Sequence, residues 1–176
     1  MAYCVVRTDK MMGTDVRSML ESVMYLGADG ETPTAIDNGN VLKVGALVGD
    51  ATVGYEREIK VGAVPAANDA LDSIVLIASP EVIYDERIRN LDDFRNEAGK
   101  ICRGYHLHSG DIFSVTKDGL DGVAAPAIGD VVELKAGTKL NVAAAGTGAT
   151  SGSTVVGSIL AIDVVGRFTY YVIQVA

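Results

Sequence analysis

The segment 155-VVGSILAIDVVGRFTYYVIQV-175 decides the fold, because two runs of strand-forming residues lie on either side of a turn signal. Residues 155–163 and 169–175 are rich in β-branched and aromatic side chains, which favour strands. Between them, Val165-Gly166-Arg167 has a composition typical of turns. The end of the chain is therefore predicted to form two strands.

The same pattern extends through the rest of the chain. Strands are predicted at residues 3–7, 41–44, 59–64, 73–78, 111–116, 131–134 and 139–143. The run at 73–78 is apolar on both sides, which indicates a strand buried on two faces. Residues 143–153 contain only Ala, Gly, Thr and Ser, so we expect a mobile loop there. Short strands at this spacing predict a mainly β protein, either a small β-sandwich or a barrel.

Two segments favour helices instead. Val16, Met19, Leu20, Val23 and Met24 follow the spacing of one helix face, and this predicts a short N-terminal amphipathic helix that ends near Gly27. The second segment is 90-NLDDFRNEAG-99, in which an Asn cap precedes two acidic residues and a Gly supplies the stop. It predicts one short surface helix.

A polar stretch at 28–34, with turn residues and a proline, predicts a linker. The chain is therefore divided into an N-terminal arm at 1–33 and a β-rich domain at 34–176. The apolar face of the arm either covers the protein's own core or contacts a partner. The candidate partner-binding residues are Met12, Val16, Met19, Leu20, Val23 and Met24. Because an apolar face needs a cover, we also expect a homo-oligomer, a dimer or trimer.

Composition excludes several classes of function. The chain has 176 residues and a formal net charge of −8, which opposes direct binding to nucleic acid. It lacks the run of about 20 apolar residues that crosses a bilayer, and its first ten residues lack a secretion signal. We therefore expect the protein to stay in the cytoplasm of the cell that makes it and to have no membrane partner. In that compartment Cys4 and Cys102 are expected to stay reduced.

The candidate groups for chemistry are weak. The possible metal ligands are Cys102, His106, His108 and Asp111, and they lack the spacing of a metal site. Ser109 lies between His108 and Asp111, but neighbours on a strand point apart and cannot form a catalytic triad. The sequence predicts no catalytic residue, no bound metal and no cofactor.

Several stretches carry a resemblance to a known class of protein. They are Asn38-Gly39 before 41-VLKVGAL-47, then 83-IYDE-86, 91-LDDF-94 and 97-EAGK-100, then 110-GDIFSVT-116, and finally 156-VGSIL-160 with the closing strand at 170–175. In their order and style these stretches resemble the head accessory proteins of tailed phages, the capsid decoration proteins. The predicted N-terminal helix departs from the simplest members, whose arm is extended.

The resemblance implies a non-enzymatic structural role. Such proteins sit on the outer surface of the capsid in the virion, bind the major capsid protein and stabilise the shell by bridging its subunits. One alternative is another structural component of the particle, such as a major capsid, head-completion or tail-tube protein. A further alternative is a small β-barrel ligand-binding protein or enzyme that uses the segment 102–111.

Overall fold

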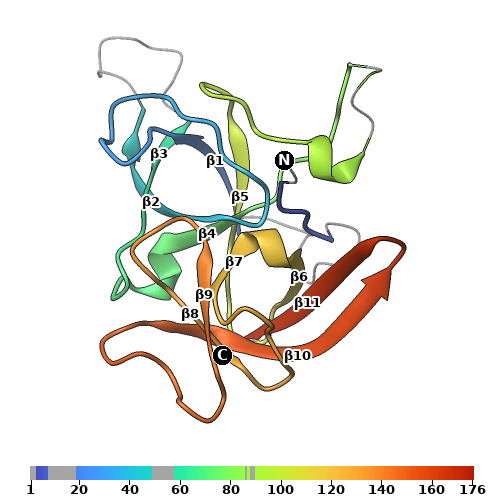
Figure 1. Cartoon of the computed structure of the whole chain (residues 1–176). Coiled ribbons are helices and arrows are strands. Elements are labelled where there is room, and N and C mark those ends of the chain that lie inside the picture. Colours follow the sequence, from blue (N-terminus) through green and yellow to red (C-terminus); the bar gives the residue numbers. More distant parts are fainter. Residues whose placement is uncertain (1–2, 8–18, 49–57, 86, 88–89) are drawn as a thin grey trace.

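The computed structural model describes residues 3–7, 19–48, 58–85, 87 and 90–176, and its strands form a barrel and a sheet (Figure 1). The barrel is closed in the order β1-β3-β2-β4-β5. Its strands are β1 (Leu20–Tyr25), β2 (Val41–Leu47), β3 (Lys60–Ala63), β4 (Ile74–Ile77) and β5 (Cys102–His106). β1 runs parallel to β3 and antiparallel to β5, and the β1–β5 pair closes the barrel.

The second half of the chain forms a six-stranded sheet in the order β6-β11-β10-β8-β9-β7. Its strands are β6 (Ile112–Thr116), β7 (Leu120–Gly122), β8 (Val131–Glu133), β9 (Leu140–Ala143), β10 (Val155–Val165) and β11 (Phe168–Val175). The short 3-10 helices η3 (Leu71–Ser73), η4 (Leu91–Asp93) and η5 (Lys117–Gly119) lie in the connections. The sequence prediction of a mainly β protein is confirmed.

The interior of the barrel is narrow and is filled by small side chains. Val23, Leu42 and Val75 are fully buried there. Two glycines leave room for them: a β-carbon on Gly62 would lie 2.6 Å from a methyl carbon of Leu42, and one on Gly104 would lie 2.8 Å from a methyl carbon of Val75. This packing explains how a chain with so few aromatic residues closes a five-stranded barrel.

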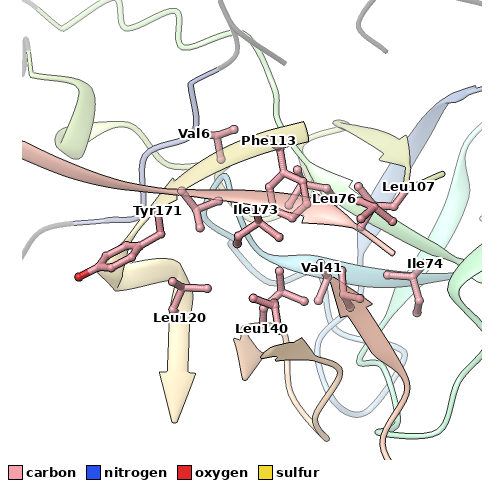
Figure 2. Close-up of a cluster of buried hydrophobic side chains, with 14 of the residues drawn as sticks. Val6, Val41, Ile74, Leu76, Leu107, Phe113, Leu120, Leu140, Tyr171 and Ile173 are labelled. Carbon is pink, nitrogen blue, oxygen red and sulfur yellow. The ribbon is translucent and has the colours of Figure 1, made fainter. Parts of the chain in front are cut away.

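A single hydrophobic core joins the barrel to the sheet (Figure 2). Ile74 and Leu76 enter it from the barrel strand β4, and Phe113, Leu140 and Ile173 enter it from the sheet. All five side chains are almost completely buried. Cys4 and Cys102 are both buried free thiols, as the sequence predicts.

The predicted N-terminal amphipathic helix is wrong where the structure describes it, because Leu20–Tyr25 is strand β1. Leu20 lies opposite Tyr105 and Val23 opposite Cys102 in the β1–β5 register. These partners come from a distant part of the chain, and such pairing overrides a local helical pattern. Residues of the segment 1–33 are thus built into the same barrel as strands of the segment 34–176.

The predicted surface helix is present only as the single turn η4. Asn90 is the N-cap residue of η4, and its backbone N–H donates a hydrogen bond to the Asp93 carboxylate at 3.1 Å. The helix ends at Asp93, and the next residue, Phe94, has an extended backbone. Asn96 then pairs with Ile36 in an isolated β-bridge. The predicted continuation to Gly99 is therefore wrong, because the backbone groups after Phe94 bind another strand segment.

The loop at 143–153 is anchored by two buried carboxylates, although the sequence predicts a mobile loop. Asp130 accepts a hydrogen bond from Ala145 N at 3.0 Å. Glu133, only 1% exposed, accepts from Thr150 N at 2.7 Å and from Thr150 Oγ1 at 2.6 Å. Burial raises the pKa of Glu133, but these bonds and one from Asn141 outweigh it, and the pKa is lowered. The carboxylate therefore remains ionised and holds the loop.

Candidate subunit-binding surfaces

The β10–β11 hairpin extends beyond the rest of the sheet as a two-stranded ribbon (Figure 1). β10 has 11 residues, but it pairs with β8 only as far as Ser158. Ile159 still exchanges backbone hydrogen bonds with Asp130 and Gly129, and beyond it the pairing of β10 within the described chain is to β11 alone. The two-residue turn Gly166-Arg167 closes the ribbon, and Gly166 adopts the positive φ of 61° that this turn requires. One edge of the outer half of β10 is consequently left without a neighbouring strand in the described structure.

Apolar side chains cover this free part of β10. The ribbon surface consists of Leu160, Ile162, Val164 and Val165, which are 44%, 37%, 73% and 47% exposed. Ile162 lies opposite the core residue Tyr171, so it belongs to the face of the sheet that covers the core. It is nevertheless exposed because the ribbon extends past that core. Grouped exposed apolar residues on a strand edge are typical of protein-binding sites.

The two ends of the sheet are protected in ways that the β10 edge is not. At the β6 end, Val6 forms a bridge with Val115, and Arg7 N donates a hydrogen bond to Ser114 O at 3.1 Å. The opposite end is the three-residue strand β7, which offers little edge. Covered and very short edges are common protections against unwanted pairing. The long apolar edge of β10 therefore stands out within this sheet.

The tip of the ribbon is fixed to the segment around η4. The guanidinium group of Arg167 lies 4.9 Å from the centre of the Phe168 ring and forms an ion pair with Asp92. Tyr3 N donates a hydrogen bond to Asp92 O at 3.1 Å. The Arg167–Asp92 ion pair thus joins the ribbon tip to η4, and the Tyr3 hydrogen bond joins η4 to the N-terminal segment.

A second exposed region, the loop surface, consists of Val82 and Tyr84. Tyr84 is 93% exposed, which is unusual for an aromatic side chain. Both residues line a groove of about 220 Å³, together with Ile83, Phe94, the three acidic residues Asp85, Asp93 and Glu97, and the basic residue Arg95. An apolar groove with an acidic rim suits an apolar side chain that has basic neighbours.

The loop surface lies in the segment 79–96, and Asn38 binds both ends of this segment. Its side-chain Oδ1 accepts hydrogen bonds from Ser79 N and Asn96 Nδ2, each at 3.0 Å. Its Nδ2 donates to Ser79 O at 2.9 Å. A single buried amide thereby fixes residues 79 and 96, between which the loop surface lies.

A cavity of about 390 Å³ lies beside β1 and β5 and is lined by Glu21, Cys102 and Arg103, among others. Burial raises the pKa of the Cys102 thiol to about 11, so at neutral pH it is a poor nucleophile. Glu21 binds Lys60 at 2.8 Å and His106 at 3.4 Å. Burial raises the pKa of Glu21, but these two contacts outweigh it and lower the pKa. Glu21 is thus a paired carboxylate and poorly suited to accept a proton from a substrate.

The structure separates the residues considered above as metal ligands. His106 contacts Glu21, whereas the backbone N–H of His108 donates to Asp111 at 2.9 Å. The Cys102 thiol contacts Lys100 O. The described residues contain no group of three or more His, Cys, Asp and Glu side chains placed to hold a metal ion.

The predicted partner-binding residues are distributed differently. Met12 and Val16 lie outside the described residues. Val23 is fully buried in the barrel, Leu20 packs against the core, and Met19 and Met24 are half-buried. Sequence reasoning did not identify the ribbon surface. A signal for it exists in 160-LAIDVV-165, where five of six residues are apolar without the alternation of a half-buried strand.

Comparison of the chain with protein-family models, with curated proteins and with solved structures gives no match. Within the described part of the chain, no helix has the length and hydrophobicity needed to cross a bilayer.

Proposed function

We propose that this protein is a structural protein of a tailed-phage particle that binds the outer surface of the capsid and stabilises the shell by bridging major capsid subunits. The observation that carries the proposal is the pair of exposed apolar surfaces, one on the ribbon and one beside Tyr84. Leaving such side chains in water is unfavourable, so a protein that keeps them exposed has a use for them in binding.

The loop surface is the contact that we assign to the capsid subunit. Tyr84 is an aromatic residue of the kind that contributes most of the energy at protein interfaces. The groove beside it carries three carboxylates, Asp85, Asp93 and Glu97, against one guanidinium group, Arg95, so its lining is net acidic although Asp85 is paired with Arg87. The complementary segment of a capsid subunit is therefore one with an apolar side chain flanked by Lys or Arg.

The residues of the cavity and the charge of the chain give little support to catalysis or to DNA binding. The thiol in the cavity beside β1 and β5 is protonated at neutral pH, and the carboxylate in that cavity is already paired. The net charge of −8 opposes contact with DNA, as expected for a protein on the outside of a shell. The resemblance of the sequence to decoration proteins points in the same direction.

The experiment uses empty shells assembled from the major capsid protein of the particle to which this chain is assigned. Wild-type protein, Tyr84→Ser and the matched exposed change Thr169→Ser are mixed with shells, and the bound fractions are compared after pelleting. We expect wild type and Thr169→Ser to pellet with shells and Tyr84→Ser to lose at least tenfold in affinity, because truncation of a hot-spot residue costs about 2 kcal/mol or more. Failure of the wild-type protein to pellet would refute the proposed function.

A further inference from the structure

We propose that two copies of this chain form a symmetric dimer by pairing the free edges of their β10 strands in antiparallel orientation, with the Ile162 residues of the two copies opposite each other across the two-fold axis. The inference rests on the proposed function, because it names a second copy as the partner of the ribbon surface. It also supplies the bridge, since a dimer carries two loop surfaces. Two linked sites on neighbouring capsid subunits bind far more strongly than either site alone.

The chemistry of the edge defines its occupant. In an antiparallel ribbon, alternate residues of β10 direct their N–H and C=O groups away from β11, so the free edge can accept another strand. The side chains of that strand must be apolar to cover the ribbon surface. β10 itself satisfies both conditions, because it is extended and five of its six outer residues are apolar. Under two-fold symmetry, both copies use the same strand edge, so each β10 edge forms hydrogen bonds with the β10 edge of the other copy.

The pleat of the strand restricts the register of such a pair. Opposite residues in an antiparallel pair share a face of the sheet, so an axis perpendicular to the sheet must pass midway between one residue and the same residue of the other copy. The β10–β11 register shifts between Ile159 and Ala161, so regular alternation begins at Ala161. Near the middle of the free edge, the choices are Ala161, Ile162 and Asp163. Centring on Asp163 places two negative charges opposite each other, which is destabilising.

Centring on Ala161 brings Asp163 opposite Ile159 of the other copy. The backbone of Ile159 is already used, because Ile159 N donates to Asp130 O at 3.0 Å and Ile159 O accepts from Gly129 N at 2.8 Å. Centring on Ile162 keeps the two Asp163 residues apart and pairs residues 160–164 before Val165 meets Ile159, whereas centring on Ala161 pairs only residues 160–162 before Ile159 is reached. It pairs Ile162 with its own copy, Val164 with Leu160, and Asp163 with the uncharged Ala161.

The charge of the protein agrees with an apolar contact. Each chain carries a formal net charge of −8, so two copies repel each other at long range. The free edge 160–165 carries a single charged residue, Asp163, and the register centred on Ile162 keeps the two Asp163 residues apart. The interface therefore brings together a part of the acidic surface that carries one charged residue per copy.

The first experiment is sedimentation equilibrium of the full chain across the micromolar range, without capsids. We expect wild type to approach twice the mass of one chain and Val164→Lys to remain a monomer. Val164 is 73% exposed, so this change is compatible with folding. Thr169→Lys is the matched control, because Thr169 lies opposite Val164 on β11, one strand away from the free edge. It should remain a dimer.

A second experiment tests the register by cross-linking. Ile162→Cys and Asp163→Cys are each oxidised with oxidised glutathione, which takes up the two electrons as the disulfide forms. We expect Ile162→Cys to give a covalent dimer on a non-reducing gel at least ten times faster than Asp163→Cys, because the two introduced thiols face each other across the axis. Equal rates, or faster cross-linking of Asp163→Cys, would overturn the register.

The remaining outcomes also decide between the proposals. A wild-type protein that is monomeric throughout the concentration range overturns the dimer, while pelleting with shells through Tyr84 would leave the proposed function intact. A dimer that persists in Val164→Lys places the contact elsewhere and overturns the inference. If Thr169→Lys is also monomeric, the copies meet through a face of the ribbon and edge pairing is excluded.

Discussion

Gly39 packs directly against Cys4, and a β-carbon at Gly39 would lie only 2.4 Å from the Cys4 sulfur. Gly39 also has a φ of 84°, in the region that favours glycine. This contact fixes the N-terminal segment on the core, where Cys4 is 2% exposed.

Gly39→Ala is therefore expected to reduce the free energy of unfolding by about 2–4 kcal/mol, through backbone strain and overpacking together. Gly30→Ala is the matched control. Gly30 has a similar φ of 73° and nothing within 4 Å, so only the strain of about 1 kcal/mol should appear. Urea denaturation of both variants measures the difference. Equal losses would mean that contact with Cys4 contributes nothing.

The two native thiols should be unreactive in the folded protein. Burial raises the pKa of Cys4 to about 12 and that of Cys102 to about 11. At pH 8 we expect slow reaction with a thiol reagent in buffer and rapid reaction of two equivalents after unfolding in guanidinium. Above pH 9.0 unfolded thiols ionise while the folded thiols keep their protons, so stability should fall as pH rises. Rapid native labelling of both thiols would contradict their burial.

Removal of residues 1–32 should unfold the barrel, since it deletes β1 from between β3 and β5. It also removes Val23, which is fully buried. We expect the truncated chain to lose its cooperative thermal transition in circular dichroism. Glu31→Gln in the full chain, a change at an exposed position, should leave that transition unchanged. A truncated chain with a wild-type transition would show that β1 is dispensable.

The sequence predicts most strands of the sheet because their signal is local. Residues 111–116 and 169–175 combine β-branched and aromatic residues with turn signals at their ends, and β6 and β11 form there. β1 was not predictable in this way. In β1, Leu20 and Met24 lie on one face and Val23 lies on the opposite face. Because apolar residues occur on both faces, their spacing along the sequence resembles that of an amphipathic helix. Only its pairing with β5, about 80 residues away in the chain, reveals the strand.

The candidate surfaces were harder to predict than the strands. Exposure of Ile162 and Val164 depends on how far β10 extends beyond the core, which is a property of the whole sheet. The anchored loop is a similar case. Nothing in 143–153 indicates order, because the groups that hold it are Asp130 and Glu133, outside the loop.

Glu133 should make the protein sensitive to acid. The pKa of Glu133 is lowered in the folded state, so its ionised form stabilises the protein above the unfolded value of 4.5. This contribution is lost as pH falls through the lowered folded pKa. Glu133→Gln brings an N–H group close to existing donors, and we expect it to cost about 1–3 kcal/mol at pH 7.

The check is urea denaturation at several pH values. The difference in unfolding free energy between wild type and Glu133→Gln should shrink as the pH falls below 4.5. Glu31→Gln serves as the exposed control and should track wild type. A difference that does not change with pH would mean that the charge of Glu133 has no part in anchoring the loop.

The most direct test of the central claim is the disassembly temperature of empty shells, followed by light scattering, with and without the bound protein. Bridging by a dimer predicts that wild-type protein raises this temperature, because disassembly must also break its contacts with two subunits. Val164→Lys should still pellet with shells at high protein concentration but raise the temperature much less. Wild-type protein that occupies the shells without changing their disassembly temperature would contradict the account.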